Sequence, residues 1–189
     1  TSFAAIDFDG KNGNSLEDAK ALISVSEVND FPAYLERSQS GNGYHVWIFF
    51  NKPIPAWKSR LVIKGLLDEA QIDSSKGSFD RIFPNQDKLS GKGLGNLIAL
   101  PLQWQKVQEG KTVFLDTSND LIPYADQFEF LKTIKRATEK QFDDLISEWN
   151  LKLEKPSVSN APKYNIDIGS QLGIEKLNSC DFVQHCKGK

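Results

Sequence analysis

The 189-residue sequence lacks several features that mark out common classes of protein. It has only two cysteines, Cys180 and Cys186, so a disulfide framework does not hold the fold together. It has no run of about 18 apolar residues and opens with no signal-peptide pattern, so we expect a soluble, cytoplasmic protein without a membrane partner. The formal net charge of -2 provides no overall basic field, although a local basic groove stays compatible with it.

Methionine is absent altogether, and the chain begins at Thr1, directly before a predicted core strand. We therefore expect a segment of a longer protein, monomeric by itself, whose further domains are its partners. The hydrophobic fraction of 39%, with 12 Phe and 4 Trp, suits a packed core and excludes a disordered chain. The length allows one sizeable domain with an appendage.

Alternation and helical spacing of apolar residues predict the elements of this domain. The predicted strands cover residues 3–8, 34–37, 44–50, 79–83, 96–100 and 111–116, and the predicted helices cover residues 16–28, 57–70 and 138–149. Ser15 with Asp18, and Thr138 with Gln141, have the spacing of helix N-terminal caps. Strands with helices between and after them predict an α+β fold with a mixed or mainly antiparallel sheet.

Asp7 and Asp9 close the first predicted strand, just before Gly10. Because side chains in a strand alternate between its two faces, both carboxylates share one face, about 6–7 Å apart. Such carboxylates repel each other unless a cation lies between them. Mg²⁺ and Mn²⁺ prefer oxygen ligands of this kind and usually also hold substrate phosphates. The pair therefore predicts metal-assisted chemistry on a phosphate.

Three other kinds of structure share such an acidic segment. A metal-free turn needs only Asp9 and Gly10, and this alternative stays open. A calcium-binding EF-hand loop is excluded, because Lys11 stands where an oxygen ligand is required and Asp18 where the closing glutamate is. A phosphatase of the haloacid dehalogenase type is disfavoured, because such enzymes have a threonine at the position of Lys11. They also need a second acidic pair after a later strand, whereas the Asp-Asp pair of this chain, residues 143–144, falls in a predicted helix.

A polar turn containing Ser40, Asn42 and Gly43 precedes the predicted strand of residues 44–50. Small residues let the backbone approach a ligand, and successive N–H groups in such a turn form an anion nest. His45 follows the turn and is placed to donate to a phosphate oxygen. The alternative is a plain hairpin turn with a packed histidine.

Asp80 lies inside a short apolar strand, after Phe79 and before Ile82. Burying an acid there is costly unless it is paired or bound to a metal. A metal site and an ordinary ion pair with Arg81 or Lys88 are equally compatible with this position.

Three acids, a glycine-containing turn and a histidine follow one another in the order of a known superfamily. The chain closely resembles the archaeo-eukaryotic primases. Asp7 and Asp9 match the Asp-x-Asp of motif I, and His45 matches the histidine that ends motif II. Asp80 matches motif III, an apolar residue followed by Asp. Four longer blocks, residues 5–9, 35–43, 80–87 and 95–103, resemble the primase-polymerases of TOTE conflict systems and CRISPR loci, and the resemblance covers roughly residues 2–134.

The resemblance implies a prokaryotic DNA-dependent primase-polymerase, which starts and extends primers on a single-stranded DNA template from NTPs or dNTPs and releases pyrophosphate. It implies two Mg²⁺ or Mn²⁺ ions held by Asp7, Asp9 and Asp80, with His45 as a further catalytic residue. The implied nucleotide-binding residues are Ser40, Asn42, Gly43, His45, Gln86, Lys92 and Gln103, and the implied template or primer contacts are Arg37 and Lys88.

The resemblance also implies a domain organisation. Residues 1–150 would form the catalytic core, with an RRM-like sheet that carries the metal site and flanking helices and strands. Composition, and not the resemblance, predicts a linker over residues 151–170, which contain Pro156, Pro162 and several polar residues. Residues 171–189 would be the truncated start of a helical accessory module.

The sequence departs from the wider superfamily in two places. A basic residue near the end of motif III is missing, so Lys92 and Gln103 are the candidates to replace its triphosphate contact. The N-terminal zinc-binding segment is also absent. We expect no zinc at Cys180, His185 and Cys186, because no fourth ligand follows them. A non-catalytic RRM-like nucleic-acid-binding module is the main alternative function, and the phosphatase is the second.

Overall fold

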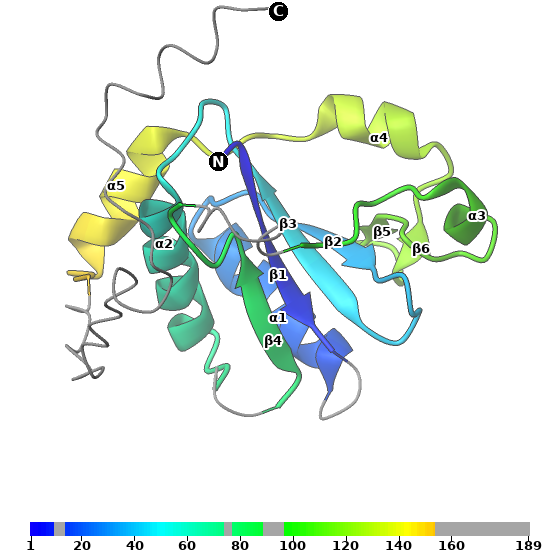
Figure 1. The fold of residues 1–189 in the computed structure, drawn as a ribbon, viewed down its shortest axis with the longest axis horizontal. Helices are drawn as coiled ribbons and strands as arrows, with labels where there is room; N and C mark the ends of the chain where they lie inside the picture. Colours follow the sequence, from blue (N-terminus) through cyan, green and yellow to red (C-terminus); the bar gives the residue numbers. More distant parts are fainter. Residues whose placement is uncertain (10–13, 74–76, 89–96, 154–189) are drawn as a thin grey trace, which may run out of the picture. The chain divides into compact units, whose positions relative to one another are not determined.

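The centre of the fold is a sheet of four antiparallel strands in the order β2-β3-β1-β4 (Figure 1). A computed structural model describes residues 1–9, 14–73, 77–88 and 97–153. The strands are β1 (Phe3–Phe8), β2 (Tyr34–Arg37), β3 (Tyr44–Phe49) and β4 (Phe79–Phe83). Because β1 pairs with both β3 and β4, the residues at the C-terminal end of β1 lie between two neighbouring strands. The predicted α+β class is confirmed.

Alternation of side chains divides the sheet into two faces. Ile6 and Phe8 of β1 and Val46 and Ile48 of β3 are fully buried and belong to the main hydrophobic core. Three helices complete this core: α1 (Ser15–Val28), α2 (Ala56–Glu69) and α5 (Glu139–Glu148). In Figure 1, α1 lies behind the sheet and α2 and α5 lie beside it. This apolar burial is the main source of the domain's stability.

The opposite face of the sheet carries a smaller apolar cluster around Trp47. Ala5 and Phe114 are buried against it, and the rings of Phe3 and Phe83 stack at 5.5 Å. The segment that contributes to this face contains α3 (Trp104–Val107), β5 (Leu115–Asp116), β6 (Ile122–Pro123) and α4 (Gln127–Thr133). The rings of Phe3, Trp47 and Phe83 lie along the first half of β1, whereas Asp7 and its strand neighbour His45 lie near the end of β1.

Two predicted strands and one predicted cap differ in the structure. Residues 97–100 form no strand, and Leu97 and Leu100 are 63% and 61% exposed. Of residues 111–116 only the last two form a strand, because Thr112 has a positive φ of 54° that interrupts the extended backbone. Ser15 does not cap α1: it lies inside the helix, and its hydroxyl donates to the Asn42 carbonyl.

The other helix start is confirmed. The Thr138 side chain accepts from the Gln141 backbone N–H, and the Gln141 side chain accepts from Thr138 in return, which is a complete capping box at α5. The predicted strand of residues 44–50 and the predicted helix of residues 57–70 are also present, with ends that differ by one residue.

The described residues belong to one compact unit, Thr1–Leu153. None of its described helices is long and apolar enough to cross a membrane. The predicted linker beyond residue 153, the predicted helical module, and Cys180, His185 and Cys186 lie outside the described residues. The predicted domain boundaries therefore stay a prediction.

Candidate active site

A single row of charged side chains crosses the whole sheet near one end. The strand register places Glu36 of β2 opposite His45 of β3, His45 opposite Asp7 of β1, and Asp7 opposite Arg81 of β4. Directly opposed residues on one sheet face are the closest side-chain neighbours between strands, and opposite charges stabilise such pairs. The row alternates acid and base from strand to strand.

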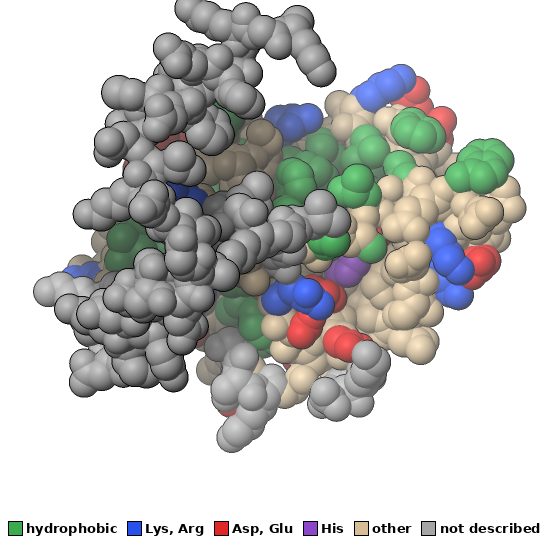
Figure 2. All heavy atoms as spheres, viewed as in Figure 1, with side chains coloured by type: hydrophobic (Ala, Val, Ile, Leu, Met, Phe, Trp, Pro, Cys, Tyr) green, Lys and Arg blue, Asp and Glu red, His purple; other side chains and the backbone are tan. Residues whose placement is uncertain are grey.

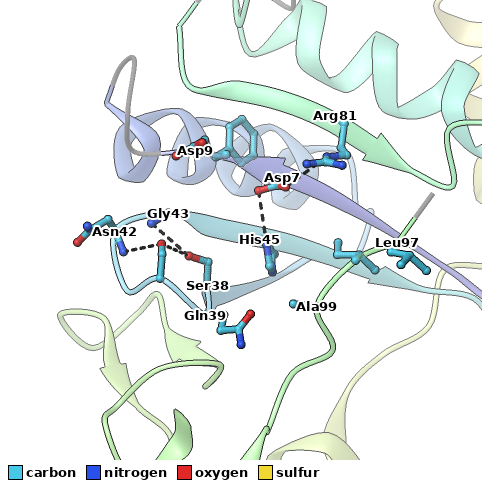
Figure 3. Close-up of a pocket in the computed structure, with 13 residues that line it drawn as sticks. Asp7, Asp9, Ser38, Gln39, Asn42, Gly43, His45, Arg81, Leu97 and Ala99 are labelled. Carbon is cyan, nitrogen blue, oxygen red and sulfur yellow. Dashed lines mark hydrogen bonds and ion pairs between the residues drawn. The ribbon is translucent and has the colours of Figure 1, made fainter. Parts of the chain in front are cut away.

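Contacts between neighbouring side chains join the members of the row, and Figure 3 shows three of them, Asp7, His45 and Arg81. His45 lies between two carboxylates: its Nδ1 is 2.9 Å from Glu36 Oε2 and its Nε2 is 3.5 Å from Asp7 Oδ1. The other Asp7 oxygen is 3.6 Å from Arg81 Nε. The exposed fraction of the side chain rises along the row, from 0% at Glu36 to 46% at Arg81. The acid–base pairs therefore run from the protein interior to the solvent.

The two carboxylates keep His45 positively charged. Burial disfavours the imidazolium, but hydrogen bonds to Asp7 and Glu36 and the charges of both outweigh it and raise the pKa of His45 to about 9. Burial also raises the pKa of Glu36, although hydrogen bonds from His45 and Trp47 act against this shift. We assign the proton to the histidine, because it has an acid on each side.

Glu36 is a buried member of the row that the sequence motifs do not indicate. Its Oε2 accepts from His45 and, at 2.5 Å, from the indole N–H of Trp47, while its Oε1 is buried without a hydrogen-bond partner. A fully buried carboxylate with an unpaired oxygen is costly and is tolerated only where its partners require it. The sequence signal for Glu36 is that an acidic residue stands inside the short predicted strand of residues 34–37.

Asp80 lies on a β-bulge and not inside a regular strand. The pairing of β1 and β4 shifts between Asp7 and Phe8, so that Arg81 faces Asp7, Phe79 faces Phe8, and Asp80 is the extra residue. Its side chain is 42% exposed, and Arg81 donates to it at 2.6 Å. Asp80 is therefore half-exposed and paired with Arg81, which is one of the two arrangements that the sequence leaves open.

The turn before β3 is ordered by its own hydroxyl groups. The Ser38 and Ser40 hydroxyls are 3.0 Å apart, and they accept from the backbone N–H groups of Gly43 and Asn42. The Gly41 N–H donates to the Ser38 carbonyl. These N–H groups are thus already paired within the turn, which differs from the open anion nest that the sequence predicts. Side chains are the groups that the turn presents to a ligand.

Gly43 is required by close packing. A Cβ atom at this position would lie 2.6 Å from the carbonyl oxygen of Phe8. This distance is shorter than real Cβ atoms tolerate, so the turn reaches the end of β1 only because residue 43 has no side chain. The predicted importance of Gly43 thus has a structural cause, which is the approach of the turn to β1.

A cavity of about 350 Å³ opens over this part of the sheet (Figure 3). Four charged residues line it: Asp7, Asp9, His45 and Arg81. The other lining residues come from β1, from the turn before β3 and from the segment after residue 96, and they are Phe8, Ser38, Gln39, Ser40, Asn42, Gly43, Leu97, Ile98 and Ala99. In Figure 2 the charged groups gather around the one purple histidine, below a green apolar area. The cavity therefore combines charged and apolar walls.

Other predicted binding residues lie outside this cavity. Gln86 and Lys88 line a second cavity of about 370 Å³ near Phe3 and Phe83. Gln103 reaches the first cavity indirectly, since its side chain accepts a hydrogen bond from Gln39 at 3.1 Å.

Arg37 donates to the Gly110 carbonyl at 3.0 Å, so its guanidinium is partly committed to holding the segment before Lys111. Lys92 lies outside the described residues.

The acids at this site fit a divalent metal by their chemistry. Within the described residues, no three His, Cys, Asp or Glu side chains are grouped closely enough to hold an ion. Asp7 and Asp80 nevertheless lie on adjacent strands and both contact one cation, the Arg81 guanidinium. Carboxylate oxygens are ligands that Mg²⁺ and Mn²⁺ prefer.

Comparison with known families decides the identity of the domain. The family model of the TOTE conflict system archaeo-eukaryotic primase domain matches residues 1–145. The chain belongs to this family. The resemblance predicted from the motifs is thereby confirmed, and Asp7, His45 and Asp80 all lie within the matched residues of the primase domain. No curated protein matches the chain.

Membership of this primase family supports a nucleotidyltransferase, primase-like activity in general. Nucleotides and nucleic acid are the corresponding ligands, and divalent metal ions are typical of such enzymes. The roles of individual residues, the metal and the exact reaction are proposals.

Proposed function

We propose that this primase domain is a DNA-dependent primase-polymerase, which joins NTPs or dNTPs on a single-stranded DNA template and releases pyrophosphate. The observation that carries this proposal is the charged row at the cavity. Asp7 and Arg81 are adjacent there, and Asp80 stands on the bulge beside them. A rigid sheet with acids at its open end is a suitable support for reacting phosphates.

In this proposal Asp7, Asp9 and Asp80 hold two Mg²⁺ or Mn²⁺ ions. Such ions, when bound, make the attacking 3′-hydroxyl more acidic and stabilise the charge on the leaving pyrophosphate. The protein would supply the three carboxylates from two neighbouring strands, with Asp7 and Asp9 at the end of β1 and Asp80 on the bulge of β4. Asp7 is held on both sides, because His45 and Arg81 contact its two oxygens from opposite strands.

In this proposal the turn before β3 contacts the nucleotide phosphates, and His45 attracts them by its charge, because both of its ring nitrogens already face Glu36 and Asp7. His45 carries a positive charge and lines the cavity, 3.5 Å from Asp7. Ser40 and Asn42 of the turn line the same cavity. A charged group held at a partly closed cavity attracts phosphate more strongly than an exposed one. Gly43 allows this turn to approach the metal-binding strand.

The template and primer contacts are proposed for Arg37 and Lys88, with Gln86, Lys92 and Gln103 as further nucleotide contacts. Gln103 is the best supported of these, because its hydrogen bond to Gln39 joins it to the cavity wall. Gln86 and Lys88 line the second cavity, which suits a strand of nucleic acid that extends beyond the nucleotide site.

The test is primer synthesis on single-stranded DNA with labelled nucleotides and Mn²⁺. We expect the unmodified chain to form dinucleotides and longer products, and Asp7→Ala and Asp80→Ala to abolish them while circular dichroism shows a folded protein. Asp144→Ala is the matched control, because this exposed acid pairs with Lys140 on α5 and should leave synthesis unchanged.

Each alternative predicts a different outcome. A non-catalytic binding module would retain single-stranded DNA without incorporating label. A phosphatase would release phosphate from nucleotides without forming a polymer. An Asp7→Ala variant that extends primers at the normal rate would remove the basis of the metal assignment.

A further inference from the structure

Arg81 holds a position between the two acids that matter most to the proposed reaction. Its Nε is 3.6 Å from Asp7 Oδ2, and its Nε and Nη2 are each 2.6 Å from Asp80 Oδ2. One guanidinium therefore bridges a carboxylate on the central strand β1 and a carboxylate on the neighbouring strand β4. A divalent ion bound by Asp7 and Asp80 would need the same oxygens.

Arg81 is also the more available of the two cations in the cavity wall. Among the described residues that line the cavity, only His45 and Arg81 carry a positive charge. His45 is 7% exposed and is held on both sides by acids, whereas the Arg81 side chain is 46% exposed. A half-exposed ion pair is worth little, so the guanidinium can leave its carboxylates at small cost.

A triphosphate carries several negative charges, and His45 is the one cation other than Arg81 among the described residues that line the cavity. The stretch from Ala99 to Gln103 has no basic residue, and Gln103 is neutral. The guanidinium of Arg81 matches a phosphate in shape, because its N–H groups form a fork that binds two oxygens at once. It already lies in the wall of the cavity that holds the turn and His45.

We propose that Arg81 is a nucleotide-positioning residue whose guanidinium is exchanged for the divalent ion at Asp7 and Asp80 and then binds the triphosphate. This inference rests on the proposed function. It gives Arg81 two successive partners: the carboxylates before the metal-bound nucleotide enters, and the phosphates afterwards. The exchange keeps every charge paired, since the metal replaces the guanidinium at the acids and the phosphates replace the acids at the guanidinium.

The exchange makes a prediction that a supporting role does not. Because metal and guanidinium compete for the same oxygens, Arg81→Gln should bind Mn²⁺ alone more tightly, by about threefold to fivefold, as expected for loss of a half-exposed ion pair. The same variant should bind a non-hydrolysable nucleotide more weakly in saturating Mn²⁺, by about tenfold or more, as expected for loss of a charge-assisted hydrogen bond. Arg81→Lys should fall between the two proteins for the nucleotide.

The experiment measures free Mn²⁺ by electron paramagnetic resonance and nucleotide affinity by calorimetry, on the full chain. Arg136→Gln is the matched control, since it removes the same charge from an exposed arginine that does not line the cavity, and it should change neither affinity. Asp7→Asn reports whether the measured Mn²⁺ occupies the proposed site.

Two results would overturn the proposal in distinguishable ways. If Mn²⁺ binding depends on Asp7 but Arg81→Gln leaves it unchanged or weakens it, Arg81 is a structural partner of the acids and the metal assignment survives. If the unmodified chain binds no Mn²⁺, or if binding does not depend on Asp7, both the metal assignment and the role of Arg81 fail.

Discussion

Replacing His45 by alanine should destabilise the domain far more than loss of a surface residue. His45 is one of two hydrogen-bond donors to the Glu36 carboxylate, which is fully buried and already has one unpaired oxygen. In His45→Ala the carboxylate would keep only the Trp47 indole as a donor. Removing one partner of a buried charged pair typically costs about 3–5 kcal/mol. This is a large part of a domain's usual stability of about 5–15 kcal/mol.

The second substitution that tests this reasoning is Glu36→Gln. The amide is neutral and has nearly the same shape, and its oxygen can still accept from His45 and Trp47. We therefore expect a cost of only about 1–2 kcal/mol for Glu36→Gln alone. The double variant Glu36→Gln/His45→Ala should be more stable than His45→Ala by at least about 1 kcal/mol, because no buried charge is left unpaired.

The assay is urea unfolding at neutral pH, followed by tryptophan fluorescence and by far-UV circular dichroism. Trp47 is a suitable reporter because its indole contacts Glu36 directly. The four proteins form a double-mutant cycle, whose interaction free energy reports the coupling of Glu36 and His45. Additive effects, or a His45→Ala variant that loses less than about 1 kcal/mol, would refute the buried-pair reasoning. The result also decides how activity data on His45→Ala are read, since lost activity could reflect unfolding.

Two further predictions concern the supports of the site and of the fold. Gly43→Ala should lower the free energy of unfolding by about 1–3 kcal/mol and weaken nucleotide affinity, because its Cβ would displace the turn from the Phe8 carbonyl; unchanged values in urea unfolding and calorimetry would show that the turn adapts without cost. Thr138→Ala should lose about 1 kcal/mol in thermal unfolding because the α5 capping box is broken, whereas Thr133→Ala at the exposed end of α4 should stay within about 0.5 kcal/mol; equal losses would contradict the capping assignment.

Much of the site could be predicted from local sequence. Alternation alone places Asp7 on the face opposite Ile6 and Phe8, and the structure has this arrangement. The family could also be predicted, because His45 and Asp80 follow in the order of its motifs and stand in long matching blocks. These features depend on neighbours in the chain or on motif order, which the sequence displays directly.

The features that sequence reasoning missed depend on how strands pair. Which residue faces His45 is set by register, so Glu36 could not be assigned to the row from its own strand. The bulge at Asp80 is defined by the pairing of β4 with Asp7 and Phe8 of β1, and no residue type in β4 predicts it. Arg81 was weighed as an ordinary ion-pair partner of Asp80, because its contact with Asp7 also requires the register.

The charged row also protects the folding chain against mispairing of its own strands. If β3 slipped by one residue against β1, His45 would point into the helix-covered core, and an apolar side chain would take its place at the cavity. Burying the imidazolium there without its acids would be costly, so only one alignment of the strands is compatible with the row. The residues that serve catalysis in our proposal thus also suppress misfolded alternatives, and neutral substitutions among them should increase aggregation during refolding.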